Sequence, residues 1–105
     1  MAKKLEPIHP GEALKELFLK PLKLSGYRLA KGTGMPQTQI SEILRGKRGI
    51  TAESALLLGA FFGTSAEVWI RMQAEYDLRR ARRKIAARLK KVNARMAEEA
   101  YTQSV

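Results

Sequence analysis

Three observations predict that this sequence folds as an all-α protein. Apolar residues recur at three- and four-residue intervals, which is the spacing of one face of a helix. No strand-like alternation and no Asn-Gly or Asp-Gly hairpin turn occurs. Prolines, glycines and capping side chains punctuate the chain at intervals that suit five helices. At 105 residues, the chain is long enough for one domain with a modest core and an extension.

The first two helices have recognisable starts and stops. Pro10 suits the first position of a helix, Glu12 complements its positive end, and Pro21 is expected to stop it. Ser25 is expected to cap the second helix, which runs to about Lys31.

The next three helices follow the same logic. The third is predicted to start near Pro36 and to end at Gly46 as a left-handed cap. Thr51 is expected to cap the fourth, which Gly63 ends. The pattern Thr64–Glu67 predicts a capping box that opens the fifth, with Thr64 as the capping residue.

Basic charge is concentrated after the fifth helix begins. Residues 77–95 hold nine basic residues and one acidic residue, whereas residues 1–76 carry a net charge of only +4. We therefore divide the chain into a domain at 1–76 and a basic amphipathic helix with a frayed tail at 77–105. Whether this helix continues the fifth is left open. Its narrow apolar stripe consists of Leu78, Ala81, Ile85, Leu89, Val92 and Met96.

The basic segment has three interpretations. The favoured one is that its stripe packs on a partner subunit. The others are nonspecific attraction to flanking DNA, and interaction with a partner protein or with ribosomal RNA around that protein. Membrane binding is disfavoured, because the stripe has no Trp or Phe anchor.

Residues Tyr27–Arg48 carry the spacing of a helix-turn-helix. Ala30 is the small residue expected where two helices cross, and Gly34 supplies the positive φ of the turn. The apolar residues expected to face the core are Leu29, Met35, Ile40 and Ile43. This motif predicts a sequence-specific DNA-binding domain.

Polar side chains occupy the opposite face of the second helix of the motif. Gln37 can bond adenine bidentately, Thr38 can offer its methyl to thymine, and Glu42 can accept from cytosine or orient a neighbour. Together with Ser41 they are predicted to read bases, although a merely solvated helix face is the alternative.

A second group of residues is predicted to contact DNA phosphates, which hold register without reading sequence. Arg45, Lys47 and Arg48 follow the reading helix, while Tyr27 could donate its hydroxyl or simply pack at the boundary. An ordinary basic surface is the alternative. Arg28 and Lys31 are weaker candidates.

Composition limits the other functions. The net charge of +10 favours a polyanionic partner. Without cysteine, disulfides and thiolate metal sites are excluded, and no apolar run approaches the roughly 18 residues of a membrane span. His9 lacks the partners that a metal or catalytic site needs and is interpreted as a helix-entry residue. We expect no enzyme activity, cofactor or metal. Four large apolar residues are interpreted as core or dimer-interface residues: Phe61, Phe62, Trp69 and Met72.

The order of these signals resembles the Cro/C1-type (XRE) helix-turn-helix family, whose lambda-repressor-like fold has five helices. A narrower resemblance links the chain to HigA-type (VapI-like) antitoxins. It rests on Ile8–Glu12, Leu22–Ser25, Arg45–Thr51, and Trp69 followed by Met72–Leu78. The match covers about residues 7–79. Gly32 departs from it, because a helix former such as Ala is expected there, at a cost of about 1 kcal/mol.

The resemblance implies a concrete function. Such antitoxins are homodimers that bind a palindrome in their own promoter and neutralise a RelE-like toxin that cleaves mRNA. It implies a bacterial cytoplasmic protein, nucleoid-associated when bound to operator DNA. A stand-alone XRE-type transcriptional regulator without a toxin is the main alternative. A charge-driven, general nucleic-acid-binding protein is another.

Overall fold

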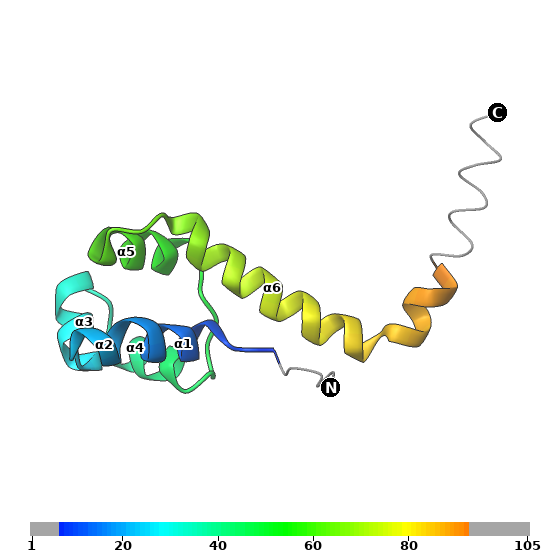
Figure 1. The fold of residues 1–105 in the computed structure, drawn as a ribbon, viewed down its shortest axis with the longest axis horizontal. Coiled ribbons are helices and arrows are strands. Elements are labelled where there is room, and N and C mark those ends of the chain that lie inside the picture. The colour runs from blue at the N-terminus through cyan, green and yellow to red at the C-terminus, as the bar shows by residue number, and fades with distance from the viewer. Residues whose placement is uncertain (1–6, 93–105) are drawn as a thin grey trace, which may run out of the picture.

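The computed structural model describes residues 7–92 of the chain, and within that range it contains helices and no strands (Figure 1). Five helical segments follow one another, and a short helical stretch at 86–92 extends the last. The all-α prediction is confirmed. Arg95, Met96 and the tail at 102–105, for which the sequence makes predictions, lie outside the described residues.

The first segment is continuous, although its central turns are wider than an α-helix. It comprises α1 (Pro10–Ala13), the π-helical η1 (Leu14–Leu19) and α2 (Lys20–Leu22). The expectation that Pro21 stops this helix was wrong. A proline ring clashes with the carbonyl four residues earlier in a regular α-helix, and the wider π-helical turns relieve that clash. The segment ends instead at Lys23, which has a left-handed φ of 55°.

The two helices of the motif form as the sequence predicted. The first, α3 (Gly26–Thr33), is capped by the Ser25 hydroxyl, which accepts from the Arg28 backbone N–H. The second is α4 (Gln37–Leu44). Between them Gly34 adopts φ 79°, a conformation that side-chain-bearing residues resist.

The fourth segment, α5 (Ala52–Phe62), has a reciprocal cap. The Thr51 hydroxyl accepts from the Ser54 backbone N–H, and the Ser54 hydroxyl accepts from the Thr51 backbone N–H. Two of the backbone donors that every helix leaves unpaired at its start are thereby satisfied.

The fifth segment is α6 (Ala66–Lys84), and its capping residue lies one position later in the sequence than predicted. Ser65, rather than Thr64, accepts from the backbone N–H of Val68. The Thr64 hydroxyl instead accepts the indole N–H of Trp69 at 2.9 Å. A buried indole needs an acceptor, and this contact supplies one while fixing the first turn of α6.

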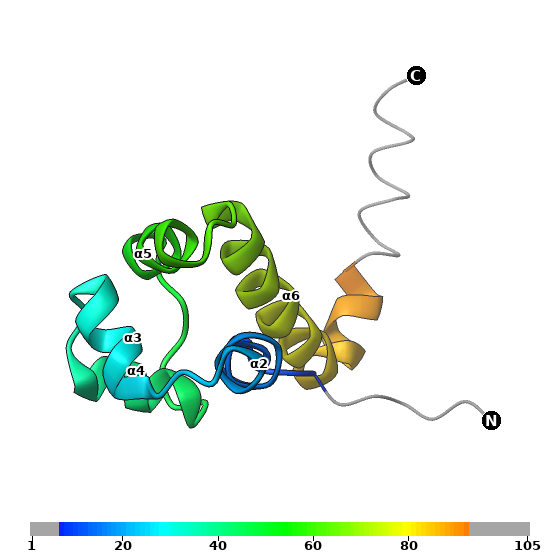
Figure 2. The same cartoon turned by 60° about the vertical axis from the view of Figure 1, so that its left-hand side comes forward.

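No break occurs in α6 at the proposed boundary between residues 76 and 77. The helix runs on to Lys84, departs from helical geometry at Ile85, and resumes at residue 86. Figures 1 and 2 both show the end of α6 projecting beyond the other helical segments. The basic segment is thus partly a continuation of a core helix.

The core lies where the five segments meet. Phe18, Phe62 and Trp69 form an aromatic cluster with ring centroids 4.7–6.1 Å apart, and Trp69 is fully buried. This packing agrees with the core interpretation of Phe62 and Trp69. The other buried apolar residues are Leu14, Leu19, Leu29, Ala30, Met35, Ile40, Ile43, Ile50, Ala55 and Leu58.

Two glycines mark close contacts between helices. A Cβ on Gly11 would lie 1.7 Å from the Ile43 carbonyl oxygen, so α1 crosses the end of α4 backbone to backbone. A Cβ on Gly32 would lie 2.2 Å from the Phe61 ring. The helix former expected at position 32 would collide with that ring, which explains the departure from the family pattern.

Candidate nucleic-acid interface

The two faces of α4 have opposite environments. Ile40 and Ile43 are 1% and 0% exposed and anchor the helix in the core. Gln37, Thr38 and Ser41 are exposed on the other side. Because the buried isoleucines fix the rotation of the helix about its axis, these polar side chains point to solvent in a defined direction.

Glu42 and Arg48, which the sequence assigned to different tasks, are partners. The Arg48 Nη2 and Nε atoms lie 2.7 and 2.8 Å from the same Glu42 carboxylate oxygen, Oε1. Exposed ion pairs of this kind contribute little stability, but they restrict the rotamers of both side chains. The predicted option that Glu42 orients a neighbour therefore has a specific partner.

The turn after α4 projects the basic residues that follow. Gly46 adopts φ 74°, and its N–H donates to the Ile43 carbonyl while the Lys47 N–H donates to the Glu42 carbonyl at 2.8 Å. This pair of bonds is a Schellman cap, which satisfies carbonyls at the end of the helix. Lys47 and Arg45 are both exposed beyond it.

A hollow of about 480 Å³ lies beside the exposed face of α4. Tyr27, which is 55% exposed, reaches it from the start of α3, and the Lys31 ammonium lies 5.8 Å from the centroid of the Tyr27 ring. Arg28 is exposed on the same helix. The hollow is lined by Lys15, Gly26, Tyr27, Gln37, Ile40, Ser41, Leu44 and Arg45.

Lys15 is the residue that sequence reasoning missed. It belongs to η1, well outside the helix-turn-helix motif, and no local signal separates it from other surface lysines. Only the fold brings it into the same hollow as Gln37 and Arg45.

The turn between α4 and α5 rests on α6. The Ile50 N–H donates to Gln73 Oε1 at 2.7 Å, and Gln73 Nε2 donates in turn to Asp77 at 3.0 Å. These bonds tie the backbone that carries Lys47 and Arg48 to the middle of the long helix.

His9 occupies the helix-entry position that the sequence indicated. Its Nδ1 accepts from the Gly11 N–H at 2.9 Å, which caps α1. Partial burial lowers the pKa of His9 below the ordinary 6.5, and the Arg80 charge lowers the pKa further, while the Asp77 charge opposes both. Neutral imidazole is the form that accepts this hydrogen bond.

Other kinds of site find no support in the described range. Among residues 7–92, no cluster of His, Cys, Asp or Glu could hold a metal ion. No helix in the same range is both long enough and apolar enough to cross a bilayer.

Comparison with known proteins identifies the family. The helix-turn-helix family matches residues 14–69. Virulence-associated protein I of Dichelobacter nodosus is 50% identical over 74 residues, which cover 70% of this chain and 68% of that protein. The structure of a HigA-family addiction module antidote protein from Coxiella burnetii is 41% identical with a TM-score of 0.79, covering 83% of this chain and 95% of that one. The chain belongs to the HigA-type, VapI-like branch of the helix-turn-helix family.

A further member of this family has been solved with DNA. Pseudomonas aeruginosa antitoxin HigA, determined with the higBA promoter, is 37% identical with a TM-score of 0.77, covering 80% of this chain and 91% of that one. The HigA-type family is not enzymatic, and the expectation that the chain is not an enzyme is confirmed. The resemblance drawn from the sequence is confirmed as well.

Proposed function

We propose that this HigA-type chain is a DNA-binding antitoxin that represses its own toxin–antitoxin operon. The observation that carries the proposal is the polar face of α4, held outward by Ile40 and Ile43. The promoter complex of Pseudomonas aeruginosa HigA supports it, because that relative shares the fold. On this proposal residues 1–76 bind DNA, residues 77–105 form an extension, and the protein acts at the bacterial nucleoid.

Within the interface, base reading falls to Gln37, Thr38, Ser41 and Glu42. The first three are exposed, and all four lie on α4, whose width suits a major groove. Glu42 contributes either by accepting from cytosine or by orienting Arg48 through their ion pair.

Phosphate contacts fall to Arg45, Lys47 and Arg48 in the turn and to Tyr27 and Arg28 at the start of α3. These residues precede and follow α4 in the sequence. On this proposal they would contact the phosphates on both sides of the groove that α4 enters. Lys15, which shares the hollow with Tyr27, joins this group.

The protein is proposed to bind its operator as a homodimer through α5. Leu56, Leu57, Ala60 and Phe61 are exposed, and their spacing of one and four residues places them on one face. A second copy of that face would cover them. Binding in successive major grooves requires such a dimer to hold its two α4 helices about 34–36 Å apart, one turn of DNA. Leu56→Glu, at a position 63% exposed, should give a folded monomer by light scattering. A dimer that survives this change excludes the α5 face.

Neutralisation of a RelE-like toxin completes the proposal. The supporting observation is the kinship with proteins named as HigA antitoxins. The product of the adjacent small gene should co-purify with this chain and lose its toxicity in cells that express both. If no such gene exists, or if co-expression rescues nothing, the stand-alone regulator is the better description.

The repressor half is tested by a gel shift on the native upstream DNA. We expect a discrete complex that an unrelated duplex fails to compete away at about 0.15 M salt, because specific contacts survive salt better than phosphate contacts do. Equal competition by unrelated duplexes would indicate the charge-driven, general nucleic-acid-binding protein instead.

A further inference from the structure

Two neighbouring arginines of α6 have different environments. Arg79 Nε lies 2.9 Å from Glu75 Oε2, so its charge is paired along the helix. Arg80 instead donates from Nη1 to the Tyr76 hydroxyl at 3.2 Å, and its guanidinium lies 5.4 Å from the centroid of the Tyr76 ring. Among residues 7–92, no carboxylate lies within ion-pair distance of Arg80.

Tyr76 connects Arg80 to the turn that follows α4. The Tyr76 ring meets the His9 ring edge-on, with centroids 4.9 Å apart. His9 in turn lies beside Gly46, since a Cβ built on that glycine would be 3.7 Å from His9 Cγ. Two aromatic rings, those of Tyr76 and His9, therefore lie between Arg80 and the turn that projects Lys47.

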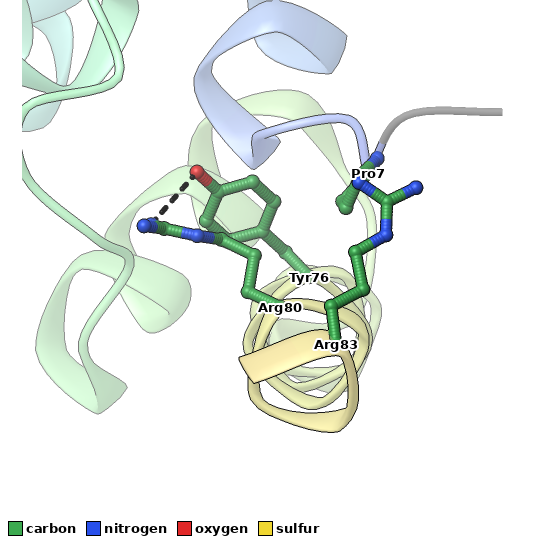
Figure 3. Close-up of a pocket in the computed structure, with 4 residues that line it drawn as sticks. All are labelled: Pro7, Tyr76, Arg80 and Arg83. Atoms are coloured by element: carbon green, nitrogen blue, oxygen red, sulfur yellow. Dashed lines mark hydrogen bonds between the residues drawn. The ribbon is translucent and has the colours of Figure 1, made fainter. Parts of the chain in front are cut away.

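The side chain of Arg80 has a defined direction. Figure 3 shows Arg80 following the Tyr76 ring to its hydroxyl, whereas Arg83 leaves α6 toward Pro7. Asp77 is the acidic residue nearby in sequence, and its carboxylate accepts from Gln73. The hydrogen bond to Tyr76 occupies one of the five N–H donors of Arg80 and leaves the others for a ligand.

We propose that Arg80, positioned by Tyr76, binds a backbone phosphate of the DNA that flanks each operator half-site. This inference rests on the proposed repressor function and extends its phosphate contacts from the α4–α5 turn onto α6. A guanidinium matches a phosphate with two parallel hydrogen bonds. Because Tyr76 already restricts the rotamers of Arg80, less conformational freedom is lost on binding than for a lysine in solvent.

The position of Arg79 supplies a matched control. Arg79→Gln and Arg80→Gln remove the same charge from adjacent positions of one exposed helix, so long-range attraction to DNA should change equally in both. A specific phosphate contact predicts a loss of affinity for Arg80→Gln that Arg79→Gln does not reproduce.

Affinity is measured by fluorescence anisotropy on two duplexes. A footprint of the wild-type protein first defines the base pairs that it protects in the major groove. The trimmed duplex ends at the last protected base pair on each side, and the extended duplex continues for one further helical turn on each side. We expect Arg80→Gln to weaken binding to the extended duplex about three- to tenfold. The slope of log affinity against log salt should fall by about 1 for each phosphate that the variant no longer binds. On the trimmed duplex Arg80→Gln and Arg79→Gln should bind alike, because both variants lose only the same long-range attraction.

Tyr76→Phe tests the positioning role, because it removes the hydroxyl and keeps the ring against His9. It should weaken binding to the extended duplex less than Arg80→Gln does, with unchanged thermal unfolding.

Equal affinities for Arg79→Gln and Arg80→Gln on the extended duplex, or equal losses of affinity on both duplexes, would overturn the inference and leave the repressor function standing. The same anisotropy measurement is made with a hairpin RNA. If Arg80→Gln weakened binding to that RNA and left binding to both duplexes unchanged, the inference would be overturned in favour of an RNA partner. Failure of the wild type to bind any upstream duplex would overturn the repressor function itself.

Discussion

The helix α4 and the outer half of α6, by which we mean its residues after Trp69, both present polar or basic faces, but different contacts hold them in place. Two buried isoleucines fix the rotation of α4, and a Schellman cap and the Gln73 hydrogen bond hold the turn that follows it. After Trp69 no residue of α6 is fully buried within the described range. Base reading needs precise placement in a groove, whereas phosphate contact tolerates a less constrained support. On our proposal, base reading therefore falls to α4, and phosphate contact falls to the turn and to α6.

Substitutions in the two halves of α6 should change the free energy of unfolding by very different amounts. Trp69→Ala should destabilise the protein by about 3–5 kcal/mol, because it leaves a cavity in the aromatic cluster. Leu78→Ala, nine residues later at a position 49% exposed, should cost less than about 1 kcal/mol. Urea unfolding followed by circular dichroism measures both. Similar costs for the two changes would show that the outer half of α6 packs more tightly than its exposure indicates.

Gly11→Ala tests the contact by which α1 holds the end of α4. The new Cβ would meet the Ile43 carbonyl, a backbone atom that cannot move without shifting the end of α4, so we expect the free energy of unfolding to fall by about 3 kcal/mol. Gly26→Ala is the control, because its Cβ would make an ordinary 3.4 Å contact with Leu44. Unfolding curves that rank the two changes in the opposite order would exclude the close crossing.

A smaller effect distinguishes reading from positioning. Gln37→Ala should relax the choice of base at one operator position, at a cost of about 1–3 kcal/mol. Lys47→Ala should weaken binding to all duplexes alike and lower the salt slope by about 1. Anisotropy on a set of single-substitution operators measures both properties. The division fails if the two variants lose affinity in the same pattern across that set.

The smallest expected effect concerns the cap of α1. Because burial favours neutral His9, the unfolded chain binds that proton at a higher pH than the folded chain. His9 should therefore contribute its full stability above about pH 6.5 and lose it as the pH falls through the lowered pKa of the folded state. His9→Asn keeps a capping side chain that does not titrate. Its unfolding free energy should change less between pH 7.5 and 5.5 than that of the wild type; an equal change would assign the pH dependence elsewhere.

The sequence was sufficient for what depends on local signals. The caps at Ser25 and Thr51, the positive-φ glycines 34 and 46 and the buried isoleucines of α4 are encoded within a few residues of where they act. Pro21 misled the prediction because a π-helical stretch accommodates it, and propensity rules assume a regular α-helix.

What the sequence could not supply depends on contacts between distant segments. Lys15 enters the hollow beside α4 only through the fold, and Gly32 is explained only by the Phe61 ring of another helix. The Glu42–Arg48 pair joins residues for which the sequence predicts separate tasks. Assignments of individual bases and phosphates stay predictions.

Protection of guanine N7 from methylation on the native upstream DNA measures whether α4 enters the major groove, since that atom lies there. If α4 reads bases from a dimer, two protected patches should appear with their centres about 34–36 Å apart, within a two-fold symmetric sequence. Protection that is absent, or patches at a separation that no whole number of DNA turns matches, would exclude major-groove reading by a dimer of this chain.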